Sequence, residues 1–215
     1  MAFRGLFKKN VLYFPGCFCK SFLPEVVANY KIILNSLGVE FLRLTDIEGC
    51  CGNPSLSSGF LETFNMLLDQ NSEIIKNQKI HTLITNCPSC VNVFTQYHNV
   101  EVEPIVTTLL KKIELLNKNY KDEEVTLHLC CDSNNKDVKT LLQKIGFKVR
   151  EDSGLCCGSH GLLKENSPKI ANEIAKRNLK SVKTEKLIVS CPWCYKHLKE
   201  NSKDVKVLEL SEVLI

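Results

Sequence analysis

Residues 83–90 (LITNCPSC) and residues 187–194 (LIVSCPWC) are copies of one pattern, and this pattern defines the expected fold. In each, a short run of apolar and β-branched residues leads directly into a Cys-Pro-x-Cys motif, and such a run is typical of a strand. Proline fits the first turn of a helix, where its missing N–H would have no partner in any case. The pattern therefore predicts a strand that ends at the first cysteine and a helix that begins at the proline.

The second half of the chain repeats the first at a spacing of about 105 residues. Strand-like segments, a Cys-Cys-Gly triplet and the Cys-Pro-x-Cys motif follow one another in the same order in both halves. The matched segments are residues 11–14 with 125–129, 37–41 with 145–149, 50–52 with 156–158, and 83–90 with 187–194. The sequence therefore predicts two copies of one structural unit.

Short apolar runs alternate with helical periodicity in each repeat, which predicts β-α-β units and a mainly parallel sheet. In the first repeat we expect strands at residues 11–14, 41–44 and 83–85 and helices at residues 24–37 and 61–76. The predicted fold class is α/β, with two pseudo-symmetric, Rossmann-like lobes. Every cysteine motif follows a strand or opens a helix, so we expect the motifs at the carboxyl ends of strands, where α/β folds bind ligands.

An amphipathic helix at residues 107–117 and a polar segment at residues 117–124 separate the two repeats. The polar segment has no apolar periodicity, which is typical of a connection. We therefore expect one domain at residues 1–120, containing the first repeat and the linker helix, and a second domain at residues 121–215.

Cysteine is the unusual component of the composition, with 12 copies among 215 residues and a formal net charge of +4. The basic residues are scattered rather than gathered in one block, so nucleic acid is not an expected partner. No apolar run reaches the roughly 20 residues that cross a bilayer, and the N-terminus lacks a signal-peptide pattern, so we expect a cytoplasmic protein without a transmembrane segment. In that reducing compartment, so many cysteines indicate metal or redox chemistry rather than disulfides.

Each repeat contains five cysteines in the same order: a single cysteine, the pair in Cys-Cys-Gly and the pair in Cys-Pro-x-Cys. Positions at helix N-termini favour thiolate over thiol, and thiolate is the form that binds metal. Five thiolates exceed the four ligands of a closed zinc site and suit a polynuclear iron cluster, although spacing alone does not define the cluster type.

This arrangement resembles the cysteine-rich CCG domain found in the catalytic B and D subunits of heterodisulfide reductase, and in subunits of glycolate oxidase, lactate utilisation systems and thiol-dependent fumarate reductase. The resemblance extends from Val11 onward, and it implies that each repeat holds a non-cubane 4Fe-4S cluster on five cysteines. The implied ligands are Cys17, Cys50, Cys51, Cys87 and Cys90 for one cluster and Cys131, Cys156, Cys157, Cys191 and Cys194 for the other. Cys19 and Cys130 remain as spare thiols or alternative ligands.

The second cysteine set departs from the family pattern. Only 24 residues separate Cys131 from Cys156, against 32 between Cys17 and Cys50, and residues 127–131 read LHLCC where the family usually has a His-Asp-Pro-Cys-His type sequence. A shortened connection limits how Cys131 turns toward the CCG segment, so we expect the first site to hold its cluster more robustly. Zinc or an incomplete cluster is an alternative at the second site, with Cys130 as a compensating ligand.

The resemblance implies an oxidoreductase subunit like the B subunit of heterodisulfide reductase, which passes electrons to a small-molecule disulfide, in the family the one joining coenzyme M and coenzyme B. His160 follows the second CCG segment and is a candidate catalytic proton donor to a departing thiolate. The chain lacks a ferredoxin-type cysteine motif, so we expect a ferredoxin-like iron-sulfur or flavin subunit as partner. Phe3, Leu6 and Phe7 share one helical face and are the candidate docking surface.

Other functions remain open at this stage. The same motif occurs in iron-sulfur subunits of lactate or glycolate oxidation and fumarate reductase systems, so the cysteines do not define the substrate. A zinc-stabilised interaction module and a metal-free thiol switch are further alternatives, and each predicts a different metal and thiol content.

Overall fold

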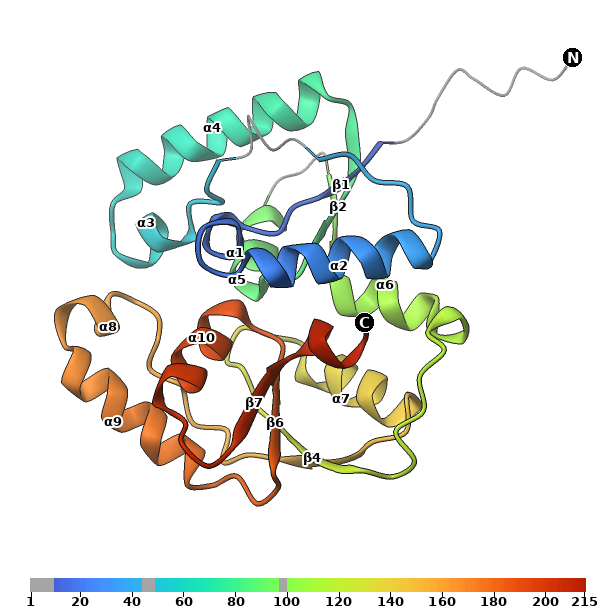
Figure 1. Ribbon diagram of the computed structural model, residues 1–215. Helices are drawn as coiled ribbons and strands as arrows, with labels where there is room; N and C mark the ends of the chain where they lie inside the picture. The colour runs from blue at the N-terminus through green and yellow to red at the C-terminus, as the bar shows by residue number, and fades with distance from the viewer. Residues whose placement is uncertain (1–9, 44–48, 97–99) are drawn as a thin grey trace, which may run out of the picture.

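A computed structural model describes residues 10–43, 49–96 and 100–215 of the protein as two α/β lobes, one above the other in Figure 1. The first lobe has a parallel sheet in the order β1-β2-β3, and the second a parallel sheet in the order β5-β4-β6-β7. The strands are β1 (Asn10–Tyr13), β2 (Ile80–Thr85), β3 (Glu101–Pro104), β4 (Glu124–Leu127), β5 (Lys148–Glu151), β6 (Lys186–Val189) and β7 (Lys206–Glu209). The predicted two-lobed, parallel α/β fold is confirmed.

Helices connect the parallel strands in both lobes. Those of the first lobe are α1 (Cys17–Phe22), α2 (Pro24–Ser36), α3 (Asn53–Ser57), α4 (Leu61–Asn77), α5 (Pro88–Phe94), α6 (Ile105–Lys111) and the 3-10 turn η1 (Ile113–Leu115). Those of the second lobe are α7 (Asn135–Lys144), α8 (Leu163–Asn166), α9 (Pro168–Leu179), α10 (Pro192–Asn201) and the 3-10 turn η2 (Leu210–Val213).

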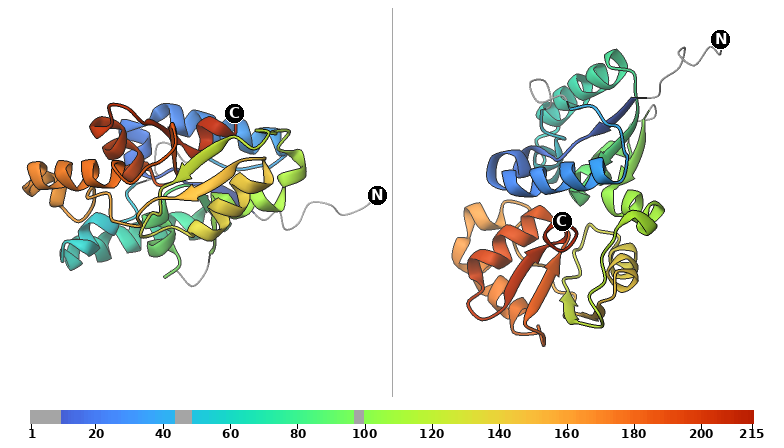
Figure 2. Two further views of the ribbon diagram at one scale, coloured as in Figure 1. Left: turned by 90° about the horizontal axis from the view of Figure 1, so that it is seen from below. Right: turned by 45° about the vertical axis from the view of Figure 1, so that its right-hand side comes forward.

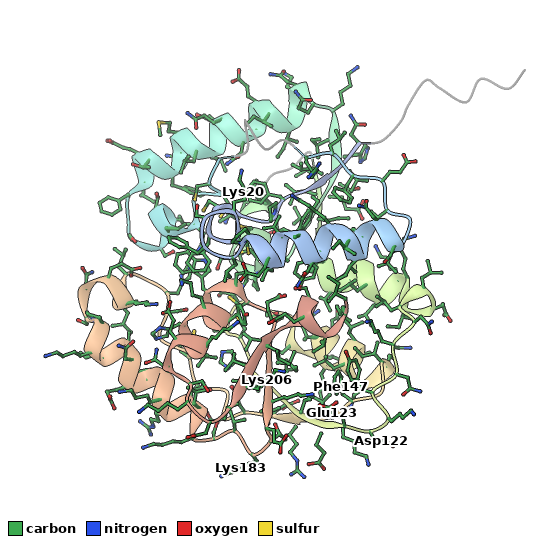
Figure 3. All side chains as sticks on the ribbon, viewed as in Figure 1. Lys20, Asp122, Glu123, Phe147, Lys183 and Lys206 are labelled. Carbon is green, nitrogen blue, oxygen red and sulfur yellow. The ribbon has the colours of Figure 1, made fainter. Side chains whose placement is uncertain are left out.

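The main hydrophobic core is shared between the lobes. It contains the buried faces of α2 and α6 from the first lobe together with β4, β6 and α7 of the second. Figure 1 and the right-hand view of Figure 2 show α2 and α6 on the side of the first lobe that faces the second. Side chains of both lobes fill the space between the ribbons, whereas Lys183 and Asp122 lie at the far end of the second lobe (Figure 3). Because this core is continuous, its burial favours one fixed arrangement of the two lobes.

One backbone hydrogen bond occurs at the same place in both lobes and confirms how the two repeats align in sequence. The Phe14 N–H, directly after β1, donates to the Ile84 carbonyl at 2.8 Å, and the His128 N–H, directly after β4, donates to the Ile188 carbonyl at 2.9 Å. Phe14 and His128 therefore occupy equivalent positions in the two repeats. Gly16 and Cys130, two residues further along in each repeat, are equivalent as well.

Two strands differ from the sequence-based expectation. Within the segment expected to form a strand at residues 41–44, the described residues make a single parallel bridge, between Leu42 and Leu12, and Leu44 lies outside the described residues. Strand β3 was not predicted, because its sequence EVEP is polar, as suits the edge of a sheet. The proposed docking residues Phe3, Leu6 and Phe7 also lie outside the described residues.

Within the described part of the chain, we find no helix with the length and apolar character needed to span a membrane.

Candidate metal centre

The Cys-Pro-x-Cys motifs follow β2 and β6, and the helices α5 and α10 that they open lie where the two lobes meet (Figure 1). Cys87 caps the N-terminus of α5 and Cys191 that of α10, with closely similar backbone angles (φ −103° and ψ 113°, against φ −102° and ψ 124°). In each case one residue separates the end of the strand from the cysteine, and the proline begins the helix. All 12 cysteines are free thiols. The strand-to-helix junctions thus deliver thiols to the contact region between the lobes.

The five expected cysteines of the first lobe form one continuous set of sulfur atoms. The Cys17 Sγ lies 3.5 Å from the Cys50 Sγ, the Cys51 side chain interacts with those of Cys50 and Cys90, and Cys90 interacts with Cys87. These thiols come from three separate segments and are mostly buried. Five convergent sulfur donors fit an iron-sulfur cluster, whose irons take thiolate ligands.

Neighbouring thiols stabilise one thiolate in this set. Hydrogen bonds from Cys17 and Cys51 lower the pKa of Cys50 to about 3, helped by the Gly52 N–H, which donates to its sulfur at 3.4 Å. The same contacts, with burial, raise the pKa of Cys17 far above its usual value, and that of Cys51 to about 12. The set therefore shares protons among its sulfurs, and binding of a metal would release them.

A glycine and an asparagine fix the CCG segment of the first lobe. Gly52 has a left-handed backbone (φ +94°), and a Cβ there would meet the Phe64 ring of α4 at 2.9 Å. The Asn71 side chain of α4 donates to the Cys50 carbonyl at 3.0 Å. The second lobe repeats both features, since a Cβ at Gly158 would meet α9 and Asn178 of α9 donates to the Leu155 carbonyl at 2.6 Å.

The sulfur set of the second lobe differs in its inner members. The Cys157 and Cys194 Sγ atoms lie 3.1 Å apart, and the Cys130 Sγ is 3.9 Å from Cys194 and interacts with Cys191. Cys130 is 2% exposed, whereas Cys131, the ligand that the resemblance implies, is exposed. The buried sulfur atoms of this lobe therefore lie around Cys130. The fold directs Cys130, the alternative ligand of the sequence-based prediction, inward in place of Cys131.

Two thiolates are stabilised in this second set. Hydrogen bonds from Cys191 and Cys194 lower the pKa of Cys130 to about 3. Hydrogen bonds from Cys156 and Cys194 lower the pKa of Cys157 well below its usual range. Cys156, which donates to Cys157, has a strongly raised pKa as a result. Soft thiolates gathered in this way are a donor set that iron and zinc both accept.

The two sulfur sets lie close to each other across the lobe boundary. The pKa of Cys87 is lowered, mainly by a hydrogen bond from Cys90, while burial and the charge of Cys130 oppose the shift. A direct polar contact joins the same region, because the Ser89 hydroxyl donates to the Asp132 carboxylate at 3.2 Å. Two metal centres held by these sets would therefore be neighbours.

A narrow cavity opens at this boundary, and residues of both lobes line it. Cys17, Cys51, Cys87 and Cys90 of the first set contribute one wall, and His160 and Trp193 of the second lobe the other. The Trp193 ring stacks on Phe18 with a centroid distance of 3.8 Å, and His160 meets the edge of Trp193 at 5.0 Å. His160, the candidate proton donor, thus belongs to the second repeat but faces the sulfur set of the first.

Polar groups at the site that sequence reasoning missed come from strand ends and helix starts. Ser89 Oγ lies 3.5 Å from the His160 Nε2, and Asp152, just after β5, pairs with His128. The sequence signal for Asp152 is its place at the end of residues 149–152, which correspond in the repeat to the expected strand at residues 41–44. Cys19, also left over in the sequence analysis, is a buried thiol whose sulfur accepts a hydrogen bond from Asn86 at 3.4 Å, and burial raises its pKa well above the usual value.

Comparison with known proteins assigns the chain to a family. The sequence profile of the CCG cysteine-rich domain matches residues 11–95 and 119–199, so the chain belongs to the CCG cysteine-rich domain family and contains two copies of the domain.

Its relatives include an uncharacterized iron-sulfur protein and subunits of fumarate and heterodisulfide reductases. The chain is 27% identical over 223 residues to the B subunit of fumarate reductase (CoM/CoB) from Methanothermobacter marburgensis, covering 94% of this chain and 45% of that protein. It is 24% identical over 237 residues to the D subunit of dihydromethanophenazine:CoB–CoM heterodisulfide reductase from Methanosarcina acetivorans, covering 97% of this chain and 58% of the relative. It is 26% identical over 242 residues to lactate utilization protein A of Oceanobacillus iheyensis, covering 95% of this chain and 96% of that protein.

The chain spans about half the length of the first curated relatives that it matches, with 46%, 45% and 43% of their lengths covered. Among solved structures, glutamate racemase from Campylobacter jejuni aligns with a TM-score of 0.44 and 13% identity over 96% of this chain and 82% of the racemase. That score is too low to carry an argument about function.

Proposed function

We propose that this protein is an iron-sulfur redox subunit that holds two clusters of the non-cubane 4Fe-4S type, one in each lobe, and transfers electrons to a small-molecule disulfide. The observation that carries the proposal is the convergence of five thiols from three segments in the first lobe, with a second sulfur set directly across the lobe boundary. The first cluster would use Cys17, Cys50, Cys51, Cys87 and Cys90. The second would use Cys156, Cys157, Cys191, Cys194 and a fifth thiol from residues 130–131.

Reduction of a disulfide consumes two electrons and two protons and releases two thiols. The bound clusters would supply single electrons and an iron that accepts a sulfur atom, which stabilises the leaving thiolate as a Lewis acid does. The chain's own contribution is the cavity at the lobe boundary, where the stacked rings of Phe18 and Trp193 limit the access of water to the first sulfur set.

His160 is the proposed catalytic donor of one of these two protons, and the other comes from solvent. Its imidazole lines the cavity beside the first sulfur set, with the Ser89 hydroxyl 3.5 Å from its Nε2. Ser89 in turn donates to Asp132 at 3.2 Å, which positions the hydroxyl. In this arrangement His160 can deliver a proton to a thiolate formed beside the first sulfur set, and Ser89 holds the ring in place.

We propose that the electrons come from a ferredoxin-like iron-sulfur or flavin subunit of a larger complex. The relatives named above include subunits of heterodisulfide reductase and fumarate reductase, which supports a role within a complex. The proposal includes a cytoplasmic location, where free thiols persist, and the division into domains at residues 1–120 and 121–215.

Oxidation of a hydroxy acid is a second candidate function. It is favoured by the match to lactate utilization protein A, in which 96% of the length of the relative is covered, a larger share than in the heterodisulfide reductase match. In that case the clusters would accept electrons from the substrate of a partner subunit. No thiolate product would form, so His160 would have no proton to deliver.

A direct test uses protein reconstituted anaerobically with iron and sulfide, reduced with dithionite and then mixed with a panel of disulfides that includes the coenzyme M–coenzyme B heterodisulfide. We expect reoxidation of the clusters with release of two thiols per disulfide for at least one member of the panel. His160→Gln should slow this reoxidation, while His81→Gln on β2, remote from the cavity, serves as the matched control. Clusters that reduce no disulfide but are reduced by a hydroxy-acid oxidising partner would favour the second candidate.

A further inference from the structure

The second sulfur set has a histidine where the first has a phenylalanine. Phe14 in the first lobe packs its ring against Phe94 at a centroid distance of 4.9 Å. The equivalent residue in the second lobe, His128, is 1% exposed and points its ring into the region of the cysteines. Burial of an imidazole costs free energy unless its two nitrogen atoms find partners, so the exchange of Phe for His requires an explanation.

One nitrogen atom of His128 is firmly held. Its Nδ1 lies 2.5 Å from the Asp152 carboxylate, whose side chain is fully buried and accepts further hydrogen bonds from the N–H groups of Leu129 at 3.2 Å and Gly154 at 3.0 Å. This contact fixes the orientation of the ring. Histidine ligands of metals are commonly held in this way, with a carboxylate on one nitrogen atom and the metal on the other.

The other nitrogen atom faces sulfur. The Nε2 of His128 makes no hydrogen bond of good geometry among the described residues, and the polar group with which the imidazole interacts on this side is the Cys157 sulfur. It lies in a buried group with the Cys157 and Cys194 sulfurs in which all ligand atoms are within 4.8 Å of one another. Cys194 also belongs to a second such group, with Cys130 and Cys191. Cys194 thus joins the group that contains the imidazole to a group of three thiols, so one imidazole and four thiols lie side by side.

The inward position of Cys130 has a counterpart in the first lobe. At the equivalent Gly16, a Cβ would lie 3.3 Å from the Cys90 sulfur and 3.6 Å from the Cys87 Cβ. A side chain at this position therefore reaches the Cys-Pro-x-Cys sulfurs. The second lobe places a thiol in that position, and the Cys130 Sγ lies 3.9 Å from that of Cys194, the counterpart of Cys90.

We propose that the second centre is a mixed imidazole–thiolate site in which the fifth thiol is that of Cys130, the His128 Nε2 is an additional ligand beside Cys156, Cys157, Cys191 and Cys194, and Cys131 is not a ligand. The inference rests on the proposed function only in requiring a transition metal at the second lobe. Nitrogen and sulfur donors of this kind suit iron, zinc and cobalt alike.

The test uses Co²⁺ as the metal, because it is paramagnetic and its binding does not depend on assembly of an iron-sulfur cluster. The full chain is freed of metal, loaded with Co²⁺ under anaerobic conditions, and examined by electron–nuclear double resonance with natural and ¹⁵N-labelled histidine. We expect the nitrogen coupling of a bound imidazole in the wild type, and its change of frequency on labelling. His128→Gln should abolish it, whereas His160→Gln and His197→Gln should retain it.

His197 is a matched control because it is a second buried histidine of the same lobe, with one nitrogen atom bonded to the Ala171 carbonyl and the other without a partner in the described chain. The sulfur ligands are tested by the sulfur-to-cobalt charge-transfer absorption. Cys130→Ser should lower its intensity, and Cys131→Ser should leave it unchanged.

Each other outcome overturns the proposal. It fails if the wild type shows no histidine nitrogen coupling, including the case in which Co²⁺ does not bind, and this measurement needs no variant to fold. It also fails if the coupling persists in His128→Gln, or if Cys131→Ser lowers the absorption and Cys130→Ser does not. Iron reconstitution is independent of these results: imidazole-bound Co²⁺ in a protein that assembles no iron-sulfur cluster would contradict the proposed function and support the mixed site.

Discussion

The two sulfur sets come from one repeated motif, yet they differ at two equivalent positions. The first set has Phe14 and Gly16 where the second has His128 and Cys130. In the first lobe, Cys17 comes within 3.5 Å of Cys50 and completes a set of five thiols. In the second, Cys131 is exposed and Cys130 lies among the buried sulfurs.

In both lobes, strands and helices bring the Cys-Cys-Gly and Cys-Pro-x-Cys thiols together in a similar way. The residues just after the first strand of each lobe decide which further thiol joins them. A glycine leaves that space open in the first lobe, and a cysteine fills it in the second. Three predictions test this contrast and a fourth tests the contact between the lobes, in order of decreasing effect.

Removal of a single cysteine should have a large effect on bound iron at the first site and almost none when the cysteine is Cys131 of the second. Cys51→Ala should remove about half of the bound iron, because Cys51 joins Cys50 to Cys90 and one of two clusters would lose a central ligand. Cys131→Ala should retain nearly all of it, since its side chain is exposed. Iron per protein under strict anaerobiosis measures both, and equal losses in the two variants would show that the ranking of these residues is wrong.

Closing the open position of the first site should weaken it. Gly16→Ala would place a methyl group 3.3 Å from the Cys90 sulfur, at a residue with φ +83°. Gly38→Ala has a comparable backbone strain, at φ +65°, but no neighbour within 4 Å. Both should lose about 1 kcal/mol of unfolding free energy from the left-handed backbone, and only Gly16→Ala should also lower the iron retained against a chelator. Similar retention in the two variants would refute a steric role of this position.

The stacked pair at the cavity should protect the first site more than the second. Phe18→Leu removes the aromatic partner that lies 3.8 Å from Trp193, and such a pair contributes about 0.5–1.5 kcal/mol beyond its buried area. We expect faster removal of iron from the first site by a chelator and a shift in the fluorescence of Trp193, the only tryptophan of the chain. Phe60→Leu, at a residue that is 61% exposed, should change neither.

The contact between the lobes should respond to pH with the smallest effect. Tyr30 of α2 donates to Glu209 of β7 at 2.8 Å, and burial raises the pKa of Glu209 to about 7, although hydrogen bonds from Ser211 and Tyr30 oppose the shift. As pH rises from 4.5 toward 7, Glu209 ionises in the unfolded chain before it does so in the folded one, so its contribution to stability declines over this window.

Glu209→Gln should therefore show a flatter dependence of unfolding free energy on pH between the ordinary pKa of 4.5 and the raised pKa of about 7 than the wild type does, measured by denaturant titration of the metal-free, reduced protein. Parallel curves for the two proteins would contradict the assignment of this titration to Glu209.

Much of the fold could be predicted from local pattern. Residues 83–90 and 187–194 indicated the strand-to-helix junctions because proline and apolar periodicity act locally. The expected helix at residues 61–76 corresponds to α4, which ends one residue later, at Asn77. The expected helix at residues 107–117 is instead α6, which begins at Ile105, followed by a 3-10 turn at Ile113–Leu115, because helix boundaries depend on tertiary contacts more than on sequence.

The site was less predictable, because its details depend on contacts between distant segments. Nothing in the order Leu-Cys-Cys indicates that Cys130 points inward, since that direction follows from the path of the chain after β4. The pairing of His128 with Asp152 joins residues that follow neighbouring strands. The position of His160 opposite the first sulfur set depends on how the lobes pack, which a repeat found in sequence does not specify.

The metal and acid-labile sulfide content of the wild-type protein distinguishes cluster binding from its alternatives in a single measurement. It is determined after anaerobic purification or reconstitution, beside the double variant Cys51→Ala/Cys157→Ala. We predict a brown protein with iron and sulfide in about equal amounts, and loss of both in the double variant. A colourless protein with about one zinc per lobe and no sulfide would contradict the two-cluster proposal, as would a metal-free protein whose thiols form disulfides on oxidation.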